Sequence, residues 1–379
     1  MLTNFRSYAR AEIICDPRPV VLTGENGAGK TNILEAISIL GPGRGLRGVK
    51  LSEMARRDDM KALDGEAGAL GAPVQWAVAA TVDTAGDRIE LGTGLTPQTG
   101  ERRQVKIQGA TAPSAAALAA HLRILWMTPA MDRLFVESAS GRRRFLDRLV
   151  LSGDPDHGAR VNAYERVMRQ RNTLLREGKM DPAWLSALEV ELAEFGVAIS
   201  AARRDLVIRL RALLEDDSPF PRSIVALDDP LALRLDQEAA IDVEQAFSKI
   251  LVDNRAQDAA AGRTLNGPHL ADLNVRHRDK NMAAAKCSTG EQKALLIGLI
   301  FAHARLLERQ KGPKPVLLLD EVAAHLDDRR RQALFDEIDA LGLQAWMTGT
   351  DRLLFKGLKD RAQWFSVAPG AVHPDIRPD

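Results

Sequence analysis

A glycine-rich stretch near the start of the chain has the residue types and the spacing of a phosphate-binding loop. Residues 24–31 read Gly-Glu-Asn-Gly-Ala-Gly-Lys-Thr and fit the pattern G-x-x-x-x-G-K-S/T without a mismatch. The glycines let the backbone curl so that its N–H groups point at phosphate oxygens, and Lys30 supplies a charge for the β and γ phosphates. The Thr31 hydroxyl can ligate Mg²⁺. The predicted phosphate-binding residues are Gly24, Glu25, Asn26, Gly27, Ala28, Gly29, Lys30 and Thr31.

Two carboxylates, Asp320 and Glu321, follow the apolar run 316–319. A buried strand that ends in aspartate at the carboxyl edge of a sheet is typical of a Walker B motif, whose aspartate holds Mg²⁺. The neighbouring Glu321 could polarise an attacking water as the general base. Buried strands often end in acidic residues without any catalytic role, but the phosphate loop strengthens this interpretation. We therefore predict Thr31 and Asp320 as metal ligands, and Lys30 and Glu321 as catalytic residues.

Other residues in the C-terminal part could complete the same site. Ser288 and Gly290 stand just before a helix expected over 294–309, where the N-terminal end of a helix attracts anions. A plain serine N-cap is the alternative for this turn. Asp327 closes a short loop after the carboxylates, and Thr348 ends an expected strand where a residue that senses the γ-phosphate could lie.

Sequence periodicity predicts the elements that must position these residues. The apolar run 19–23 predicts a buried parallel strand before the phosphate loop, and 32–40 has the apolar spacing of a helix after it. Because residues 2–8 begin abruptly for an edge strand, the true start of the protein could lie upstream. The other expected elements are a strand end and turn at 2–8, a strand at 11–15, antiparallel strands within 50–110, a helix at 115–121 and a buried strand at 124–128.

From Gly141 to about Glu215 helical periodicity dominates, with breaks at 153–155 and at Gly178. The stretch 222–262 is mixed and receives no firm assignment. The predicted fold class is α/β, a mixed sheet carrying the phosphate loop with a mostly helical inserted second domain. The predicted domains are an N-terminal ATPase lobe at 1–140, the helical insertion at 141–262 and a C-terminal ATPase lobe at 263–379.

Composition limits the classes of protein to which the chain could belong. Its 379 residues carry a formal net charge of +1, so any nucleic-acid surface must be a local patch. Cys15 and Cys287 are too few for a disulfide framework or a zinc site, which fits a reducing cytosol. No signal peptide or long apolar run is present, so we expect a cytoplasmic protein without a membrane partner. Aromatic residues are only 4% of the chain, which disfavours a base-stacking platform.

The order of these motifs resembles the ABC-type ATPases of the SMC class. A phosphate loop, a long insertion, an S-x-G signature, an Asp-Glu Walker B motif and a Leu-Asp loop follow one another. In that class the signature of one subunit caps ATP held by the phosphate loop of another. The resemblance therefore implies ATP and Mg²⁺ as cofactors and an ATP-dependent homodimer. The chain is too short for the coiled-coil arm of an SMC protein, and sustained heptads are absent.

Within this class the chain resembles the RecF family of bacterial recombination mediators over nearly its whole length. This resemblance implies a weak DNA-stimulated ATPase that binds single-strand/double-strand junctions or gaps. It also implies help in loading RecA alongside RecR and RecO, and a link to the SOS response. The motifs that carry it are Asn-Phe-Arg-Ser-Tyr at 4–8, the phosphate loop at 24–31, Gly-Arg at 43–44, Thr-Pro at 128–129, Arg-Arg-Arg-Phe-Leu-Asp at 142–147, Arg-Gln-Arg-Asn at 169–172, Gly-Pro-His at 267–269 and Ser-Thr-Gly-Glu-Gln-Lys at 288–293.

The chain also departs from the pattern of ABC ATPases. Cys287 replaces the usual leucine of the signature, and Glu291 stands where many ABC proteins have glutamine. Ala130 and Met131 follow the Thr-Pro motif, where the family usually has an acidic residue. The switch histidine of transporters is absent, and Thr348 is its proposed substitute.

Several interpretations stay open at this point. His269 could contact nucleotide, DNA or the interface between the lobes, or it could be structural. The basic turn at 142–148 could contact a phosphate backbone or form a solvated face. Trp126, Trp184 and Trp346 are expected in the core. The rival functions are the nucleotide-binding subunit of another ABC system, such as a transporter, and a P-loop kinase for a small molecule.

Overall fold

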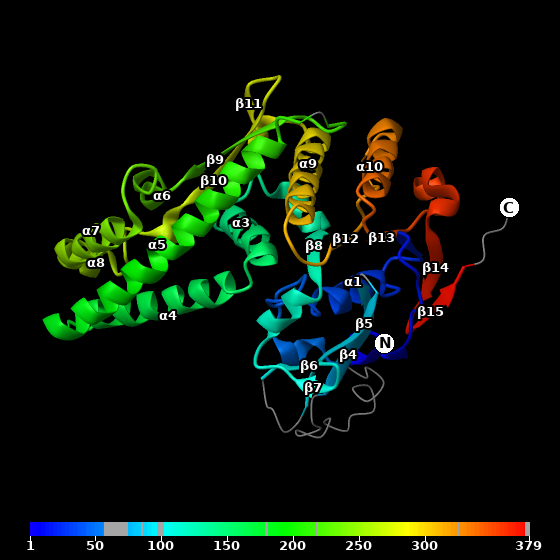
Figure 1. Cartoon of the computed structure of the whole chain (residues 1–379), viewed down its shortest axis with the longest axis horizontal. Helices are drawn as coiled ribbons and strands as arrows, with labels where there is room; N and C mark the ends of the chain where they lie inside the picture. Colours follow the sequence, from blue (N-terminus) through cyan, green and yellow to red (C-terminus); the bar gives the residue numbers. More distant parts are fainter. Residues whose placement is uncertain are drawn as a thin grey trace, which may run out of the picture. The chain divides into compact units, whose positions relative to one another are not determined.

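The computed structural model describes residues 1–56, 75–84, 86–96, 102–178, 181–216, 218–324 and 326–375. The chain divides into two compact units, one formed by Met1–Met131 with Leu307–Asp379 and the other by Asp132–Leu306. The blue beginning and the red end of the chain thus belong to the same unit (Figure 1). Val74 and His325, which belong to an expected strand and to the Leu-Asp loop, lie outside the described residues.

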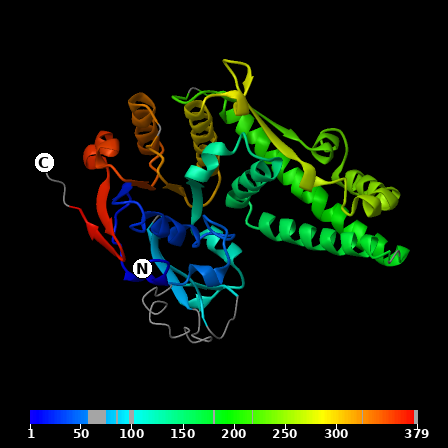
Figure 2. The same cartoon turned by 180° about the vertical axis from the view of Figure 1, so that it is seen from behind.

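A largely parallel sheet carries the phosphate loop in the first unit. Its strand order is β15-β14-β3-β13-β12-β8, and β14 with β15 forms its antiparallel pair. Figure 2 shows this hairpin in red, and β14 pairs with the blue strand β3. Because the carboxyl ends of parallel strands share one edge, β3, β13 and β12 deliver the residues that follow them to neighbouring positions. The strands are β3 (Val20–Thr23), β8 (Arg123–Met127), β12 (Pro315–Leu319), β13 (Ala345–Gly349), β14 (Gln363–Ala368) and β15 (Ala371–Pro374).

An antiparallel sheet with the order β2-β1-β4-β5-β6-β7 contains the other described strands of this unit. Its strands β4 to β7 confirm the antiparallel strands expected within 50–110. The expected strand at 11–15 is wrong. Arg6 has a left-handed φ of 51°, so the chain turns back early and Tyr8 pairs with Phe5. Ile14 is 83% exposed, in keeping with its place outside any strand. The strands are β1 (Leu2–Phe5), β2 (Tyr8–Ala11), β4 (Trp76–Thr84), β5 (Asp87–Leu95), β6 (Gln104–Ile107) and β7 (Ala110–Thr111).

Helix α1 (Lys30–Ser38) begins with the last two residues of the phosphate loop. Its Ile33 and Leu34 are almost fully buried in a core that includes residues of both sheets. Burying a side chain of this kind contributes roughly 1.5–3 kcal/mol to folding. The remaining helical segments of this unit are η1 (Leu51–Met54), η3 (Ala115–Ala120), α10 (Asp328–Ala340) and η7 (Arg352–Arg361), with η4 (Pro129–Arg133) at the unit boundary.

Arg103, directly before β6 of the antiparallel sheet, binds the turn that follows helix α1. Its guanidinium donates to the carbonyls of Gly43 and Gly41 at 3.0 and 3.2 Å, and also to that of Ile39. A cation at this end satisfies carbonyls that lack a partner within the helix and complements the helix dipole. Burial lowers the pKa of Arg103 to about 10, so it stays charged at neutral pH.

The second unit is mostly helical, and Figure 1 shows its helices α4 and α5 side by side. The predicted breaks are confirmed, since α3 ends at Gly153 and Gly178 follows α4 with a left-handed φ of 68°. Asp181 caps the next helix by accepting from two backbone N–H groups. Trp184 is 56% exposed, so its expected place in the core is wrong. The first three helices of this unit are α3 (Ala139–Gly153), α4 (His157–Arg176) and α5 (Pro182–Leu213).

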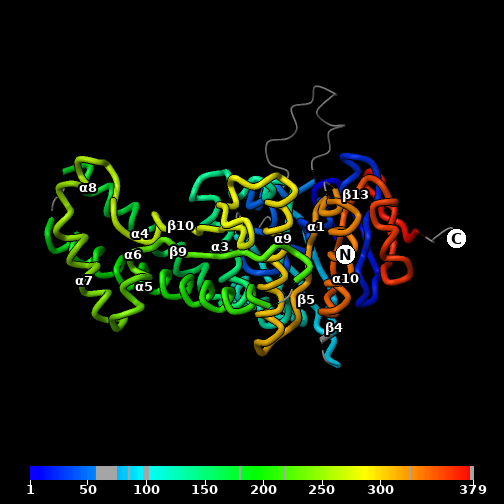
Figure 3. The backbone as a smooth tube through the Cα atoms, turned by 90° about the horizontal axis from the view of Figure 1, so that it is seen from above, coloured from blue at the N-terminus to red at the C-terminus, as the bar shows by residue number. Residues whose placement is uncertain are grey.

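A small antiparallel sheet, β11-β10-β9, joins distant parts of this unit. Strand β10 pairs with β9 along its whole length, and residues 263–306 belong to the helical unit. This grouping differs from the predicted three domains, whose boundaries were 140 and 262. Figure 3 shows α7 and α8 beside α5 and α4. The remaining elements are β9 (Ser223–Asp228), α6 (Pro230–Arg234), α7 (Ala240–Asp253), α8 (Arg255–Ala261), η5 (Pro268–Leu270), β10 (Asp272–His277), β11 (Met282–Ala283), η6 (Ala284–Lys286) and α9 (Thr289–Glu308).

Candidate functional site

The phosphate loop runs from the end of β3 to the start of α1, as its sequence predicts. Gly24 passes so close to the neighbouring strand that a Cβ atom would lie 2.2 Å from the Val367 carbonyl oxygen. Gly29 has a left-handed φ of 111°, and a Cβ there would lie 2.7 Å from the Tyr8 hydroxyl. Both positions therefore require glycine, because any side chain would push the loop out of its present path.

Lys30 folds back over the loop and is only 5% exposed. Its Nζ donates to the carbonyl oxygens of Gly24 at 2.6 Å and Glu25 at 2.8 Å. Burial lowers the pKa of Lys30, while the charges of Glu321 and Asp320 raise it. An ammonium has three donors, so Nζ keeps a further N–H for a phosphate oxygen. In the described loop the Lys30 ammonium therefore already lies over the backbone that would bind phosphate.

Asp320 and Glu321 lie at the same sheet edge as the loop. The Thr31 hydroxyl donates to Asp320 Oδ1 at 2.9 Å, and the carboxylate is 7% exposed. A hydroxyl and a carboxylate are the hard oxygen donors that Mg²⁺ prefers. Among the described residues no cluster of three or more His, Cys, Asp or Glu side chains could hold a metal. This pair suits a cation that takes its other ligands from phosphate and water, as Mg²⁺ does with nucleotides.

Residues near the N-terminus hold the loop from the side, a role that the sequence did not reveal. The buried Tyr8 hydroxyl donates to the Gly29 carbonyl at 3.1 Å, and Asn32 donates to the Ser7 hydroxyl at 2.9 Å. Burial raises the pKa of Tyr8 to about 12, so the phenol remains a donor at neutral pH. The motif at 4–8, which served only as a family marker, therefore positions the phosphate loop.

Glu35 is a second contributor that sequence reasoning missed. It points inward from α1, is fully buried and accepts from Arg6 at 2.7 Å and Arg47 at 2.9 Å. A buried carboxylate must be paired, and two guanidinium groups supply that pairing here. The detectable signal was an acidic residue between the apolar Leu34 and Ala36 on a core helix.

The signature turn forms a helix cap in this structure. Helix α9 begins at Thr289, so the expected start at 294 is wrong by one and a half turns and Gly290 lies in the first turn. The Ser288 hydroxyl accepts from the Glu291 N–H at 3.4 Å, and Glu291 accepts from the Ser288 N–H at 3.1 Å. This reciprocal pair is a capping box, which the alternative interpretation of the turn anticipated. A hydrogen bond from Lys280 and that from the Ser288 N–H lower the pKa of Glu291 to about 2.

The other predicted site residues have identifiable local roles. Asp327 caps α10 by accepting from the Arg330 N–H at 2.8 Å. Thr348 is fully buried and hydrogen-bonds with Asp320 and Glu321 rather than facing solvent. Contacts of Asp327 and Thr348 with a nucleotide remain predictions.

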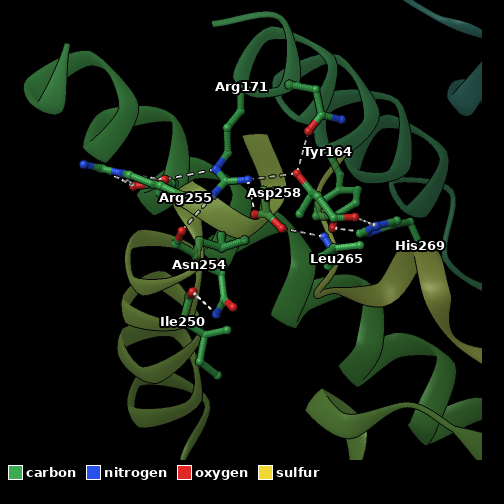
Figure 4. Close-up of polar contacts among 12 residues, drawn as sticks. Tyr164, Arg171, Ile250, Asn254, Arg255, Asp258, Leu265 and His269 are labelled. Atoms are coloured by element: carbon green, nitrogen blue, oxygen red, sulfur yellow. Dashed lines mark hydrogen bonds and ion pairs between the residues drawn. The ribbon is translucent and has the colours of Figure 1, made fainter. Parts of the chain in front are cut away.

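The Arg-Gln-Arg-Asn motif of α4 supplies the centre of a buried polar network. Arg171 is fully buried and donates to Glu189 at 3.0 Å, to Asp258 at 2.6 Å and to the Leu251 carbonyl at 2.7 Å. Figure 4 shows Arg171 between Asp258 and the Arg255 side chain, which also contacts Glu189. The arginine therefore connects α4 with α5, α7 and α8 inside the helical unit.

His269 belongs to the same network, and its contacts there support the structural role that the sequence left open. Its Nε2 lies 3.0 Å from the Thr264 carbonyl and its Nδ1 lies 2.8 Å from the Tyr164 hydroxyl (Figure 4). A carbonyl can only accept, so Nε2 carries the proton and Nδ1 accepts from the phenol. Burial lowers the pKa of His269, which favours this neutral form. Both ring nitrogens are thus engaged within the unit, as the structural interpretation predicted.

Two arginines of the basic turn at the start of α3, Arg142 and Arg143, are occupied internally, whereas Arg144 is exposed. Arg142 forms a bidentate pair with Asp272 at 2.7 and 2.8 Å, and Arg143 donates to the Ala271 carbonyl at 2.6 Å. Asp147, the last residue of the same motif, accepts from Arg203 at 2.8 Å through both oxygens. Arg142 and Arg143 therefore form neither a free DNA-contacting patch nor a solvated face.

Comparisons with known proteins give consistent matches. The family model described as RecF/RecN/SMC N terminal domain matches residues 1–366. A protein of Rhizobium rhizogenes (strain K84) named DNA replication and repair protein RecF is 50% identical over 375 residues, covering 98% of this chain and 96% of its own length. The protein of the same name from Rhizobium meliloti (strain 1021) is 50% identical over 379 residues, with the same coverage.

A solved structure described as the recombination mediator protein RecF-ATPrS in the RecFOR pathway covers 99% of this chain and 96% of its own, with a TM-score of 0.81 at 22% identity. This likeness confirms the expected α/β fold. None of the described helices is both long and apolar enough to span a membrane.

Proposed function

The chain belongs to the RecF family of DNA replication and repair proteins, and from that premise we propose that it is an ATP-dependent, DNA-binding recombination mediator. The observation that carries this proposal is the 2.9 Å hydrogen bond between Thr31 and Asp320, which are 289 positions apart in the sequence. It places the phosphate loop beside the Walker B carboxylate, where the two side chains could hold Mg²⁺ together.

ATP is the proposed ligand, held by the backbone N–H groups of 24–31 and by the Lys30 ammonium. Thr31 and Asp320 would hold Mg²⁺, which when bound neutralises phosphate charge and orients the triphosphate. Glu321 is the proposed general base and takes a proton from the attacking water. The weak, DNA-stimulated ATPase activity expected from the family is part of this proposal.

Replacing Glu321 with glutamine should trap ATP without hydrolysing it. Turnover should fall about 100-fold or more, because general bases contribute about 10²–10⁴-fold and the amide cannot accept the proton. ATP affinity should change little, since Lys30, Thr31 and Asp320 remain. Steady-state phosphate release and equilibrium ATP binding measure the two quantities. Glu308→Gln, at an exposed ion pair with Lys314, is the control that should hydrolyse normally. If Glu321→Gln hydrolyses ATP at the normal rate, another group is the base.

ATP-dependent dimerisation is the second part of the proposal. The signature at 288–290 would cap the γ-phosphate of ATP that the partner subunit binds, using the N-terminal end of α9. DNA at single-strand/double-strand junctions or gaps is the proposed substrate, and slow hydrolysis would release it. Action with RecR and RecO in loading RecA, a link to the SOS response and a cytoplasmic location complete the proposed role.

A Ser288→Arg substitution should block dimerisation while leaving ATP binding by the monomer nearly unchanged. The added cation would fill the anion-binding end of α9, and hydrolysis and its stimulation by DNA should fall with dimerisation. Sedimentation with and without ATP and duplex DNA measures the effect. Ser114→Arg is the matched control, because Ser114 also caps a helical segment and belongs to no proposed site. Normal ATP-driven dimerisation by Ser288→Arg would favour the kinase-like alternative.

A further inference from the structure

Thr348 lies at the same edge of the phosphate-loop sheet as the Walker B carboxylates. Strand β13 is parallel to β12, and Leu319 pairs with Met347, so the next residues, Asp320 and Thr348, are neighbours at the ends of the two strands. On its other side β13 pairs with β3, which leads into the phosphate loop. Thr348 is fully buried between these strands.

The Thr348 hydroxyl uses its donor and an acceptor position within the site. It donates to Asp320 Oδ1 at 2.7 Å and accepts from the backbone N–H of Glu321 at 2.9 Å. A hydroxyl has a single proton to donate, and this one points at Asp320. Contact with a γ-phosphate oxygen would need that same proton, so the geometry disfavours the γ-phosphate sensor expected from the sequence.

The accepted hydrogen bond holds an unusual piece of backbone. Glu321 has a φ of 49°, in the left-handed region that side chains other than glycine rarely adopt. This conformation sets the direction in which the Glu321 side chain leaves the sheet. A buried hydroxyl that binds its N–H favours this conformation over the extended one.

We propose that Thr348 is a positioning residue, whose hydroxyl fixes the Asp320 carboxylate and the Glu321 backbone together so that the metal ligand and the general base keep their mutual geometry. The proposal deepens the proposed ATPase function and rests on it. Thr348 acts through Asp320 and Glu321 and need not touch ATP. Small misplacements of reacting groups are costly, since about 1 Å can reduce a rate about 100-fold.

The test compares Thr348→Val, which keeps the shape of the side chain but loses the hydroxyl, with Thr348→Ser, which keeps the hydroxyl. Thr23→Val is the matched control, because the Thr23 hydroxyl is also buried in this sheet but makes only a 3.5 Å bond to the Phe365 carbonyl. The measurements are kcat, the affinities for ATP and for ADP, and hydrogen exchange of the Glu321 amide in nucleotide-free protein.

Thr348→Val should lower kcat about tenfold or more, because catalysis depends steeply on the placement of reacting groups. It should weaken ATP and ADP binding equally and by less than about threefold, since positioning does not involve direct contact with the nucleotide. It should also speed exchange at Glu321. Thr348→Ser should restore both kcat and exchange, and Thr23→Val should resemble the wild type.

If Thr348→Val loses affinity for ATP but keeps its affinity for ADP, the proposal is overturned in favour of a γ-phosphate sensor. Normal kcat with normal exchange would also overturn it, as would equal losses in Thr23→Val. If the wild-type protein hydrolyses no ATP, the proposed function fails, while amide exchange in the nucleotide-free variants still decides whether Thr348 holds the Glu321 backbone.

Discussion

Replacing Lys30 with alanine should abolish tight ATP binding and with it detectable hydrolysis. The ammonium is nearly buried and already lies over the phosphate loop, bonded to the Gly24 and Glu25 carbonyls. Losing a buried, hydrogen-bonded charge partner costs about 2–5 kcal/mol, which corresponds to a loss of affinity of about 30-fold or more. Isothermal titration calorimetry with ATP in the presence of Mg²⁺ measures this loss.

Two other lysine variants make this experiment specific. Lys30→Arg should bind ATP but turn it over poorly, because a planar guanidinium cannot replace the compact ammonium in a loop of this size. Lys314→Ala removes an exposed lysine that pairs with Glu308 in the same unit and should leave ATP binding unchanged. Wild-type ATP affinity in Lys30→Ala would mean that the loop at 24–31 is not the nucleotide site.

Replacing Arg171 with methionine should strongly destabilise the helical unit. The substitution leaves Asp258 buried without its guanidinium and deprives Glu189 of one of its two arginines. Breaking a buried ion pair in this way costs about 3–5 kcal/mol, because the remaining charge stays buried and poorly compensated. Urea denaturation followed by circular dichroism measures the free energy of unfolding.

Arg166 offers a matched control on the same helix. Its pair with Glu191 is exposed, so Arg166→Met should cost less than about 1 kcal/mol. Arg171→Lys should also destabilise the protein, since one ammonium cannot donate to Glu189, Asp258 and the Leu251 carbonyl in the geometry of the fork. Equal stabilities of Arg171→Met and Arg166→Met would contradict the central role of Arg171 in the network.

Much of the phosphate-loop unit could be predicted because its signals are local. The pattern at 24–31 and the apolar run before Asp320 each specify a strand end and the chemistry that follows it. The helix breaks at Gly153 and Gly178 were likewise encoded in single turns. Such features depend on a few adjacent residues, and tertiary contacts did not override them.

Features that depend on distant partners could not be predicted in this way. The sequence identifies Arg142 and Arg171 as basic but does not identify Asp272 or Asp258 as their partners. Strand β10 belongs to the helical unit because it pairs with β9, and no local sequence pattern predicts this pairing. The sequence places Thr348 at the end of a strand, whereas the direction of its hydroxyl is known only from the fold.

Capping of ATP in trans is tested most directly by mixing Ser288→Arg subunits with Lys30→Ala subunits and measuring ATP turnover. In a mixed dimer, the intact phosphate loop of one subunit meets the intact signature of the other, and the second site carries both defects. If capping occurs in trans, the mixture should hydrolyse ATP well above the rate of either variant alone. A mixture that stays as inactive as its separate components, although mixed dimers form, would contradict this account of the site.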